Sequence, residues 1–214
     1  MSFHPYGATI GNLTPPLSIA NGGTGVTGTS ALNAWSAADQ GMLAWNYDGP
    51  GMTNGGSIAL AVGGTMYTMA VKVPAAITVT NIVMELITNG SVLTSAQCFA
   101  CLYQGAGGAL VGHSADQAVA WGSGAAKLLT MPLAGGPFAV AAGVVYVGVF
   151  YNGTTGPAFF RSNSTLSLAN AGLADAAARW GTANTGLTTA ATIPATLGTI
   201  TATGAVASYW CALS

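Results

Sequence analysis

The sequence predicts an all-β protein: an antiparallel β-sandwich, jelly-roll-like, over residues 51–214, preceded by an extended, loop-rich N-terminal arm over residues 1–50. Two observations predict the sandwich. From residue 57 onward, short apolar runs alternate with Gly, Pro and Asn-Gly turn signals at the spacing of antiparallel strands. The most apolar run, residues 138–153, is rich in β-branched and aromatic side chains and is bounded by turn residues. The arm follows from a third observation, the density of Pro and Gly before residue 51.

Residues 144–151 form the strand around which we expect the sandwich to be built. Both alternating sets are apolar, beginning with Val144 and Tyr146 on one side and Val145 and Val147 on the other. Because such a strand is covered on both faces, other sheets, loops or sister chains must pack over it. The run is shorter than the roughly 18 residues of a bilayer-spanning helix, so we expect no membrane insertion.

The other elements are placed by the same signals. The arm is predicted to hold one short helix over residues 30–43, with Ser30 as its N-cap. Between residues 161 and 205 the strand signal fades into a long loop, in which residues 172–180 predict a helical turn or two. Strands are expected over residues 57–62, 65–73, 77–88, 96–104, 110–114, 127–133, 138–151, 158–161 and 205–213.

Charge is scarce in this chain. Lys and Arg number four and Asp and Glu five, so charged residues make up 4%, against roughly 25% in ordinary soluble domains. Four scattered cations do not neutralise a phosphate backbone, which argues against nucleic-acid binding. Soluble sheets usually protect their free edges with charged residues. We therefore expect a homo-oligomer in which sister chains cover these edges.

The sequence predicts no cofactor, no metal and no catalysis. The run of residues 23–28 matches G-x-G-x-x-G, but no strand precedes it. Cys98 and Cys101 would face opposite sides of a strand, and with Cys211 they are expected to be buried free thiols. His113 lies close to Asp116 in sequence, but adjacency alone does not make a catalytic triad.

Aromatic residues beside polar ones suggest a sugar site. Trp121 follows Asp116, Trp180 follows Arg179, and Asp175 stands four residues before Arg179, where the two would pair on a helical turn. Flat rings next to hydrogen-bonding groups suit a neutral sugar, and long loops on a rigid sandwich often bind ligands. These five residues are the predicted glycan-binding residues, with packing of the rings in the core or in an oligomer interface as the alternative.

Several stretches resemble bacteriophage proteins. Residues 16–25, PLSIANGGTG, are similar to the PLSxANGGTG segment of tail-fibre and tail-appendage proteins. Other stretches resemble minor tail proteins of phages of actinobacteria: residues 131–133, 142–143, 144–153, 193–198 and 208–214.

This resemblance implies a virion structural protein, commonly a homotrimer, that is assembled in the bacterial cytoplasm and released by lysis. Residues 1–50 would then attach to other virion structural proteins, and the sandwich would contact the host, through cell-wall polysaccharide. The alternative within this class is a head or tail decoration protein that contacts only other virion proteins. Outside it stand a depolymerase that cleaves envelope polysaccharide and a free sugar-binding module.

Overall fold

The computed structural model describes residues 36–48, 56–161, 170, 173–174, 178–202 and 208–214. The chain divides into Met1–Trp35 and a second unit, Ser36–Ser214. The predicted N-terminal arm lies mostly outside the described residues, and the account below concerns the second unit. Within the part that the structure describes, no helix is long and apolar enough to cross a membrane.

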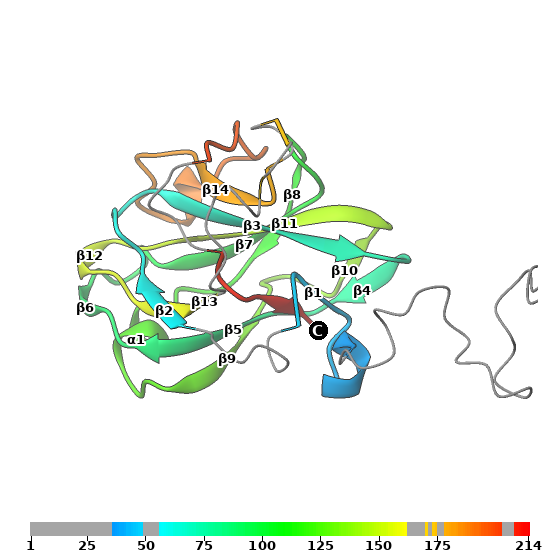
Figure 1. Cartoon of the computed structure of the whole chain (residues 1–214). Helices are drawn as coiled ribbons and strands as arrows, with labels where there is room; N and C mark the ends of the chain where they lie inside the picture. Colours follow the sequence, from blue (N-terminus) through cyan, green and yellow to red (C-terminus); the bar gives the residue numbers. More distant parts are fainter. Residues whose placement is uncertain (1–35, 49–55, 162–169, 171–172, 175–177, 203–207) are drawn as a thin grey trace, which may run out of the picture. The chain divides into compact units, whose positions relative to one another are not determined.

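The unit consists of two main antiparallel sheets, one above the other in Figure 1. In the first sheet, β5 is the central strand: β9 pairs along one edge of it, and β15 and β13 share the other edge. The first sheet contains β1 (Ala44–Trp45), β2 (Gly56–Ala59), β5 (Asn81–Thr88), β9 (Lys127–Pro132), β13 (Ala158–Arg161) and β15 (Ala212–Leu213). The second contains, in spatial order, β14 (Trp180–Ala183), β3 (Met66–Val73), β11 (Gly143–Phe150), β7 (Phe99–Tyr103) and β8 (Leu110–His113).

Two small two-stranded sheets lie beside the main sheets in the described part of the unit. β4 (Ile77–Val79) pairs with β10 (Phe138–Val140), and β6 (Ser91–Leu93) pairs with β12 (Gly153–Thr155). The unit's described residues also form one short helix, α1 (Ala118–Gly122), and the 3-10 turns η4 (Ala37–Gln40) and η6 (Ala190–Thr192).

The pairing is that of a jelly roll. Eight strands pair in a nested order, the first with the last and so on inward: β2 with β13, β3 with β11, β5 with β9, and β7 with β8. This nesting places β2-β13-β5-β9 in one layer and β3-β11-β7-β8 in the other, which is the double-sheet arrangement that closes a jelly roll. The predicted antiparallel jelly-roll sandwich is confirmed.

The predicted N-terminal helix is wrong in type over its described part, residues 36–43, while its predicted cap, Ser30, lies outside the described residues. Of residues 30–43, the described part forms the 3-10 turn η4, and its cap is Ser36, whose hydroxyl accepts a hydrogen bond from the Asp39 N–H. β1 follows and pairs with β15. Asn46 joins the same edge, because its side chain donates to the Tyr209 carbonyl over 2.6 Å. The folded unit therefore begins earlier than the boundary expected at residue 50.

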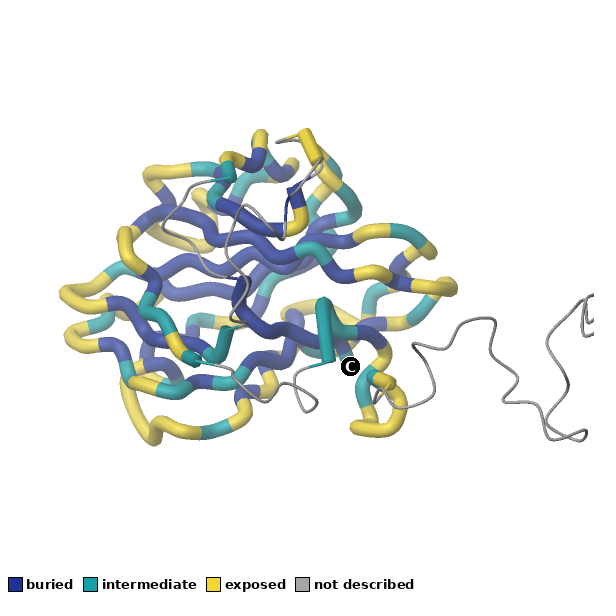
Figure 2. Tube along the Cα trace, in the orientation of Figure 1, coloured by how far each residue is buried: buried dark blue, intermediate teal, exposed yellow. Residues whose placement is uncertain are grey.

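The core between the sheets holds a chain of aromatic rings. Trp121 packs edge-on against Phe159, Phe159 against Tyr209, and Tyr209 against Tyr67, with centroids 5.4, 6.2 and 6.2 Å apart. Edge-to-face pairs of this kind contribute beyond their buried area. Figure 2 shows buried residues along the strands of both layers and exposed residues at many of the turns that join them.

The outer face of the second sheet is covered by the chain itself. Met66, Tyr146 and Phe150 point away from the inter-sheet core and pack with Leu187, Ile200 and other apolar residues of the segment 178–201. Figure 1 shows this segment, in orange, above β3, β11 and β7. The prediction that the central strand is covered on both faces is confirmed, and the cover comes from the loop that was expected to bind ligand.

Candidate functional site

The structure places both predicted sugar-stacking tryptophans in the interior. Trp121 lies on α1 with no exposed surface, and Trp180 begins β14 with 2% of its surface exposed. A sugar ring stacks on an accessible aromatic face, so the prediction that these two rings bind a glycan is wrong. Their polar neighbours in the sequence gave no indication of this burial, which the packing of the two sheets imposes.

Asp116 has a structural role. Its carboxylate accepts hydrogen bonds from the backbone N–H groups of Ala96, Cys98 and Ala118 at 2.8, 3.1 and 3.3 Å. Ala96 has a φ of 59°, a left-handed conformation that is uncommon for alanine. The carboxylate therefore fixes the backbone just before β7. Its oxygen atoms accept hydrogen bonds from the fold itself.

His113 shows no catalytic arrangement. Its Nδ1 lies 2.8 Å from the Ser114 carbonyl oxygen, and its ring packs edge-on against Phe99. The Ser114 hydroxyl donates to the Ala115 carbonyl and accepts from the Ala100 N–H. Nδ1 of His113 and the hydroxyl of Ser114 are thus both engaged with the backbone.

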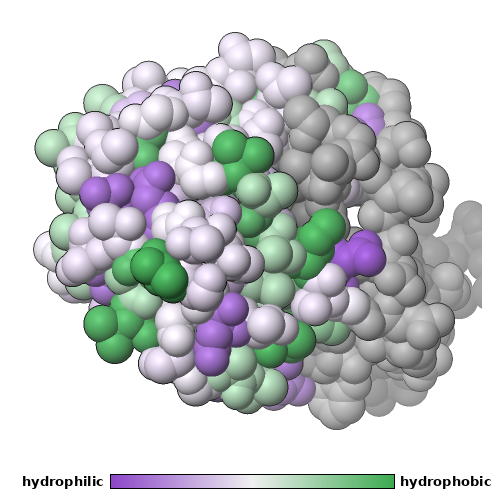
Figure 3. Space-filling model, turned by 90° about the vertical axis from the view of Figure 1, so that its left-hand side faces the viewer, coloured by the Kyte–Doolittle hydropathy of each residue, from purple (hydrophilic) through white to green (hydrophobic). Residues whose placement is uncertain are grey.

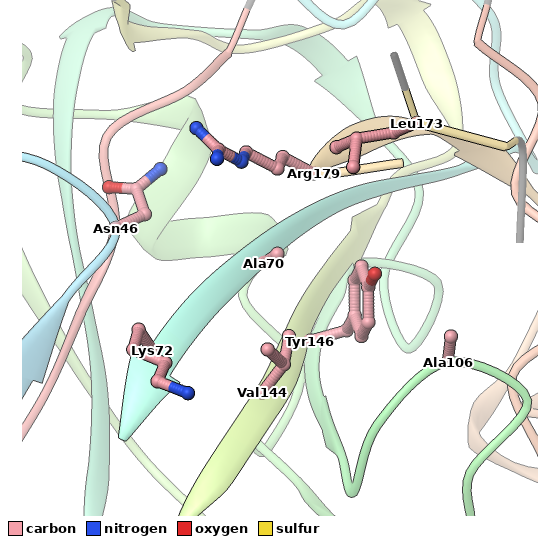
Figure 4. Close-up of a pocket in the computed structure, with 8 residues that line it drawn as sticks. All are labelled: Asn46, Ala70, Lys72, Ala106, Val144, Tyr146, Leu173 and Arg179. Carbon is pink, nitrogen blue, oxygen red and sulfur yellow. The ribbon is translucent and has the colours of Figure 1, made fainter. Parts of the chain in front are cut away.

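Arg179 is the predicted site residue that the structure leaves accessible, and it lines a groove. Asp175 lies outside the described residues, so its predicted pairing with Arg179 stays a prediction. The groove has a volume of about 540 Å³ and lies on the outer face of the second sheet (Figure 4). Its lining residues are Asn46, Ala70, Lys72, Ala106, Val144, Tyr146, Leu173 and Arg179.

The floor of the groove is set by strand register. Lys72 lies directly opposite Val144, and Ala70 directly opposite Tyr146, in the antiparallel pair β3 and β11. These four side chains share the outer face because alternate residues of a strand point the same way. Farther along the same strands, Met66 and Phe150 are covered by the segment 178–201. The groove is the end of this face where Lys72 and Val144 stay exposed.

Backbone hydrogen bonds fix the wall that carries Arg179. The Arg179 carbonyl accepts from the Ala70 N–H at 2.6 Å, and its N–H donates to Oδ1 of Asn170 at 2.8 Å. Asn170 is 8% exposed, and its Nδ2 donates to the Trp180 carbonyl at 2.9 Å. The Tyr146 hydroxyl donates to the Ala178 carbonyl at 3.0 Å, and burial raises the pKa of Tyr146, which keeps this donor protonated. The guanidinium of Arg179 therefore projects from an anchored backbone.

The groove combines two cations with an apolar floor. Lys72 and Arg179 are two of the four cations of the chain, and both side chains are exposed. Ala70, Val144 and Leu173 add apolar surface, and the lining residues that the structure describes include no carboxylate, histidine or cysteine. Such a lining can hold a ligand that has both an apolar face and an acidic or hydroxyl group.

Sequence reasoning found Arg179 but missed Lys72. A signal was present, since Lys72 is the one charged residue in a mostly apolar strand. The sequence did not show that Val144 is the cross-strand neighbour of Lys72. Nor did it show that Arg179 lies near the same end of the strand. Both depend on the pairing of β3 with partners far along the chain.

The remaining predicted sites can be stated briefly. The three cysteines are free and buried, as predicted. Among the described residues, no three His, Cys, Asp or Glu side chains are grouped so that they could hold a metal ion. A comparison with protein-family models finds no match for the chain. A comparison with curated proteins finds none either.

Proposed function

We propose that the chain is a bacteriophage virion structural protein, a minor tail protein or the tip of a tail fibre, that attaches to host-envelope glycan through the groove between Lys72 and Arg179. The observation that carries the binding role is this groove, an accessible hollow with two cations on an anchored sheet. The virion assignment is supported by the resemblance of residues 16–25 to tail-fibre segments. Residues 1–50 would attach to other virion proteins, and the assembly would be a homotrimer.

The jelly-roll architecture is compatible with this role. Jelly rolls occur among viral capsid and lectin domains, but a fold alone does not define a function. Sugars present C–H faces and hydroxyl groups, which suit the apolar floor and the cationic donors of the groove. We propose binding without catalysis, since the lining residues that the structure describes offer no pair of carboxylates such as a glycosidase uses.

Binding of the purified full-length chain to intact cells tests the attachment role. A fluorescently labelled chain is mixed with a panel of actinobacterial cells that are untreated, treated with periodate or treated with protease. We expect binding to at least one strain, loss of binding after periodate, which destroys sugar diols, and retention after protease. Failure to bind any strain, or loss after protease alone, would contradict attachment through glycan.

The decoration alternative has one structural observation in its favour. Val92 and Val119 are 79% and 82% exposed, and they line a hollow of about 330 Å³ near β6 and α1. Val92 has a φ of 45°, which is strained for a β-branched residue. Figure 3, which shows this end of the unit, has apolar residues among largely neutral ones. Exposed apolar side chains of this kind can contact another protein.

Labelling intact virions with an antibody to the chain separates the two proposals. Label at the tail tip would support attachment to the host. Label spread over the head or along the tail tube, together with no cell binding by the free chain, would favour decoration.

A further inference from the structure

We infer that the ligand of the groove is an acidic glycan, an oligosaccharide that carries a carboxylate or phosphate group, and that this group binds between Lys72 and Arg179. The inference rests on the proposed function for the origin of the glycan in the host envelope. It differs from the sequence expectation of a neutral sugar stacked on tryptophan.

The distribution of charge is the first step. Two of the four cations lie in one groove, and none of the acidic residues that the structure describes is among its lining residues. In the part of the chain that the structure describes, neither Lys72 nor Arg179 has a carboxylate partner. Two like charges in one groove repel each other, and an anionic group placed between them reduces this repulsion.

The geometry of the groove is the second step. Figure 4 shows the Arg179 guanidinium extending toward Asn46 and the Lys72 ammonium beside Val144, with Ala70 of β3 between the two cationic residues. An arginine forms two parallel hydrogen bonds with a carboxylate or phosphate, and a lysine acts as a point charge beside it. Because the Arg179 backbone is held by Ala70 and Asn170, less freedom is lost when the guanidinium binds.

The apolar floor makes a glycan a better ligand than a free anion. Ala70, Val144 and Leu173 offer apolar surface on which the C–H face of a sugar ring can pack. An isolated phosphate would leave this apolar surface uncovered. The volume of about 540 Å³ falls within the roughly 300–1,000 Å³ of small-ligand sites. Two cations are too few for a nucleic-acid backbone, whose binding proteins make about 6–10 phosphate contacts.

Calorimetric titration of the full-length chain with defined oligosaccharides tests the inference. The probes are a uronic-acid oligosaccharide, its carboxyl-reduced neutral counterpart, and a glycerol-phosphate-substituted oligosaccharide of the same length. We expect at least one acidic probe to bind and the neutral counterpart to bind about tenfold more weakly or worse. The two acidic probes distinguish carboxylate from phosphate as the bound group.

Matched variants locate the site. Lys72→Gln and Arg179→Gln should each weaken the acidic probe by about tenfold, with Lys72→Arg keeping most of the affinity. Lys127→Gln is the control, because Lys127 lies in the first sheet, where its Nζ donates to the Ser123 carbonyl. It removes one cation without touching the groove. Circular dichroism and thermal unfolding confirm that each variant is folded.

Three results would overturn the inference: equal binding of acidic and neutral probes, no binding of either acidic probe, or unchanged affinity in both groove variants. These outcomes are distinct from failure of the proposed function. A chain that binds cells but prefers the neutral probe keeps the attachment role and loses the acidic ligand. A chain that binds the acidic probe through Lys72 and Arg179 but binds no cells keeps the ligand class and loses the attachment role.

Discussion

The indole ring of Trp121 stands edge-on against the ring of Phe159, with 5.4 Å between their centroids and an angle of 83° between their planes, and neither side chain has exposed surface. Trp121 joins α1 to the centre of the sandwich through this contact. Removing the ring leaves a cavity in a close-packed core, so we expect Trp121→Ala to lower the free energy of unfolding by about 3–5 kcal/mol. Urea denaturation followed by far-UV circular dichroism measures this loss.

Trp121→Phe is the matched variant, and it should lose less stability because an aromatic ring remains beside Phe159. Cell binding by the folded fraction of either variant should equal that of the wild type. A Trp121→Phe protein that keeps its stability but no longer binds glycan would restore Trp121 to the binding site.

Asp116 should contribute to stability without contributing to binding. Its carboxylate accepts from three backbone N–H groups around the start of β7. Hydrogen bonds to a charged acceptor contribute about 1.5–3 kcal/mol, so Asp116→Ala should destabilise the unit by roughly that amount. Asp116→Asn, which keeps one oxygen acceptor, should lose less. Reduced affinity for glycan in a fully stable Asp116→Asn protein would contradict the structural role.

Asn170 should affect both stability and affinity, because it holds the backbone of Arg179. Its side chain bridges the Arg179 N–H and the Trp180 carbonyl. We expect Asn170→Ala to lower the free energy of unfolding by about 1–3 kcal/mol and to weaken the acidic probe. The control is Asn184→Gly, which removes the bond to the Gly198 N–H at a residue whose φ of 46° suits glycine. Equal loss of affinity in the two variants would show that Asn170 has no specific effect on Arg179.

Stability should fall in alkaline solution. Burial raises the pKa of Cys98 from 9.0 to about 11, with a smaller contribution from the nearby Asp116 charge. Burial also raises the pKa of Cys101 and Cys211. Because the folded protein holds these protons more tightly than the unfolded chain does, their contribution is fully present below pH 9 and is lost as the pH rises toward 11 and beyond.

Thermal unfolding between pH 7 and pH 11 measures this effect, and the melting temperature should drop progressively above pH 9. Cys98→Ala should make the decline shallower between pH 9 and 11. A melting temperature that stays constant to pH 11 would contradict the burial of the thiols.

The sequence predicted the architecture better than the site. Alternation and turn signals located the main strands, and the two apolar faces of residues 144–151 correctly required cover on both sides. They did not identify the cover, because the cluster that holds Met66, Leu187 and Ile200 joins segments far apart in the chain. β1 was missed because its two residues, Ala44 and Trp45, are extended only through pairing with β15.

The site predictions failed where they relied on neighbours in sequence. Trp180 was assigned to a binding loop because it follows Arg179, yet successive residues of an extended chain point in opposite directions. Arg179 is exposed in the groove while Trp180 is buried. Lys72 entered the site only through the register that places it opposite Val144. Side chains that meet across strands are not visible in a linear pattern.

Cell adsorption by the wild-type chain and by the Lys72→Gln/Arg179→Gln double variant tests the central claim most directly. Flow cytometry with labelled, folded protein would compare both with Lys127→Gln on a strain that binds the wild type. The account predicts that the double variant loses cell binding while Lys127→Gln retains it. Adsorption of the double variant equal to that of the wild type would contradict attachment through this groove.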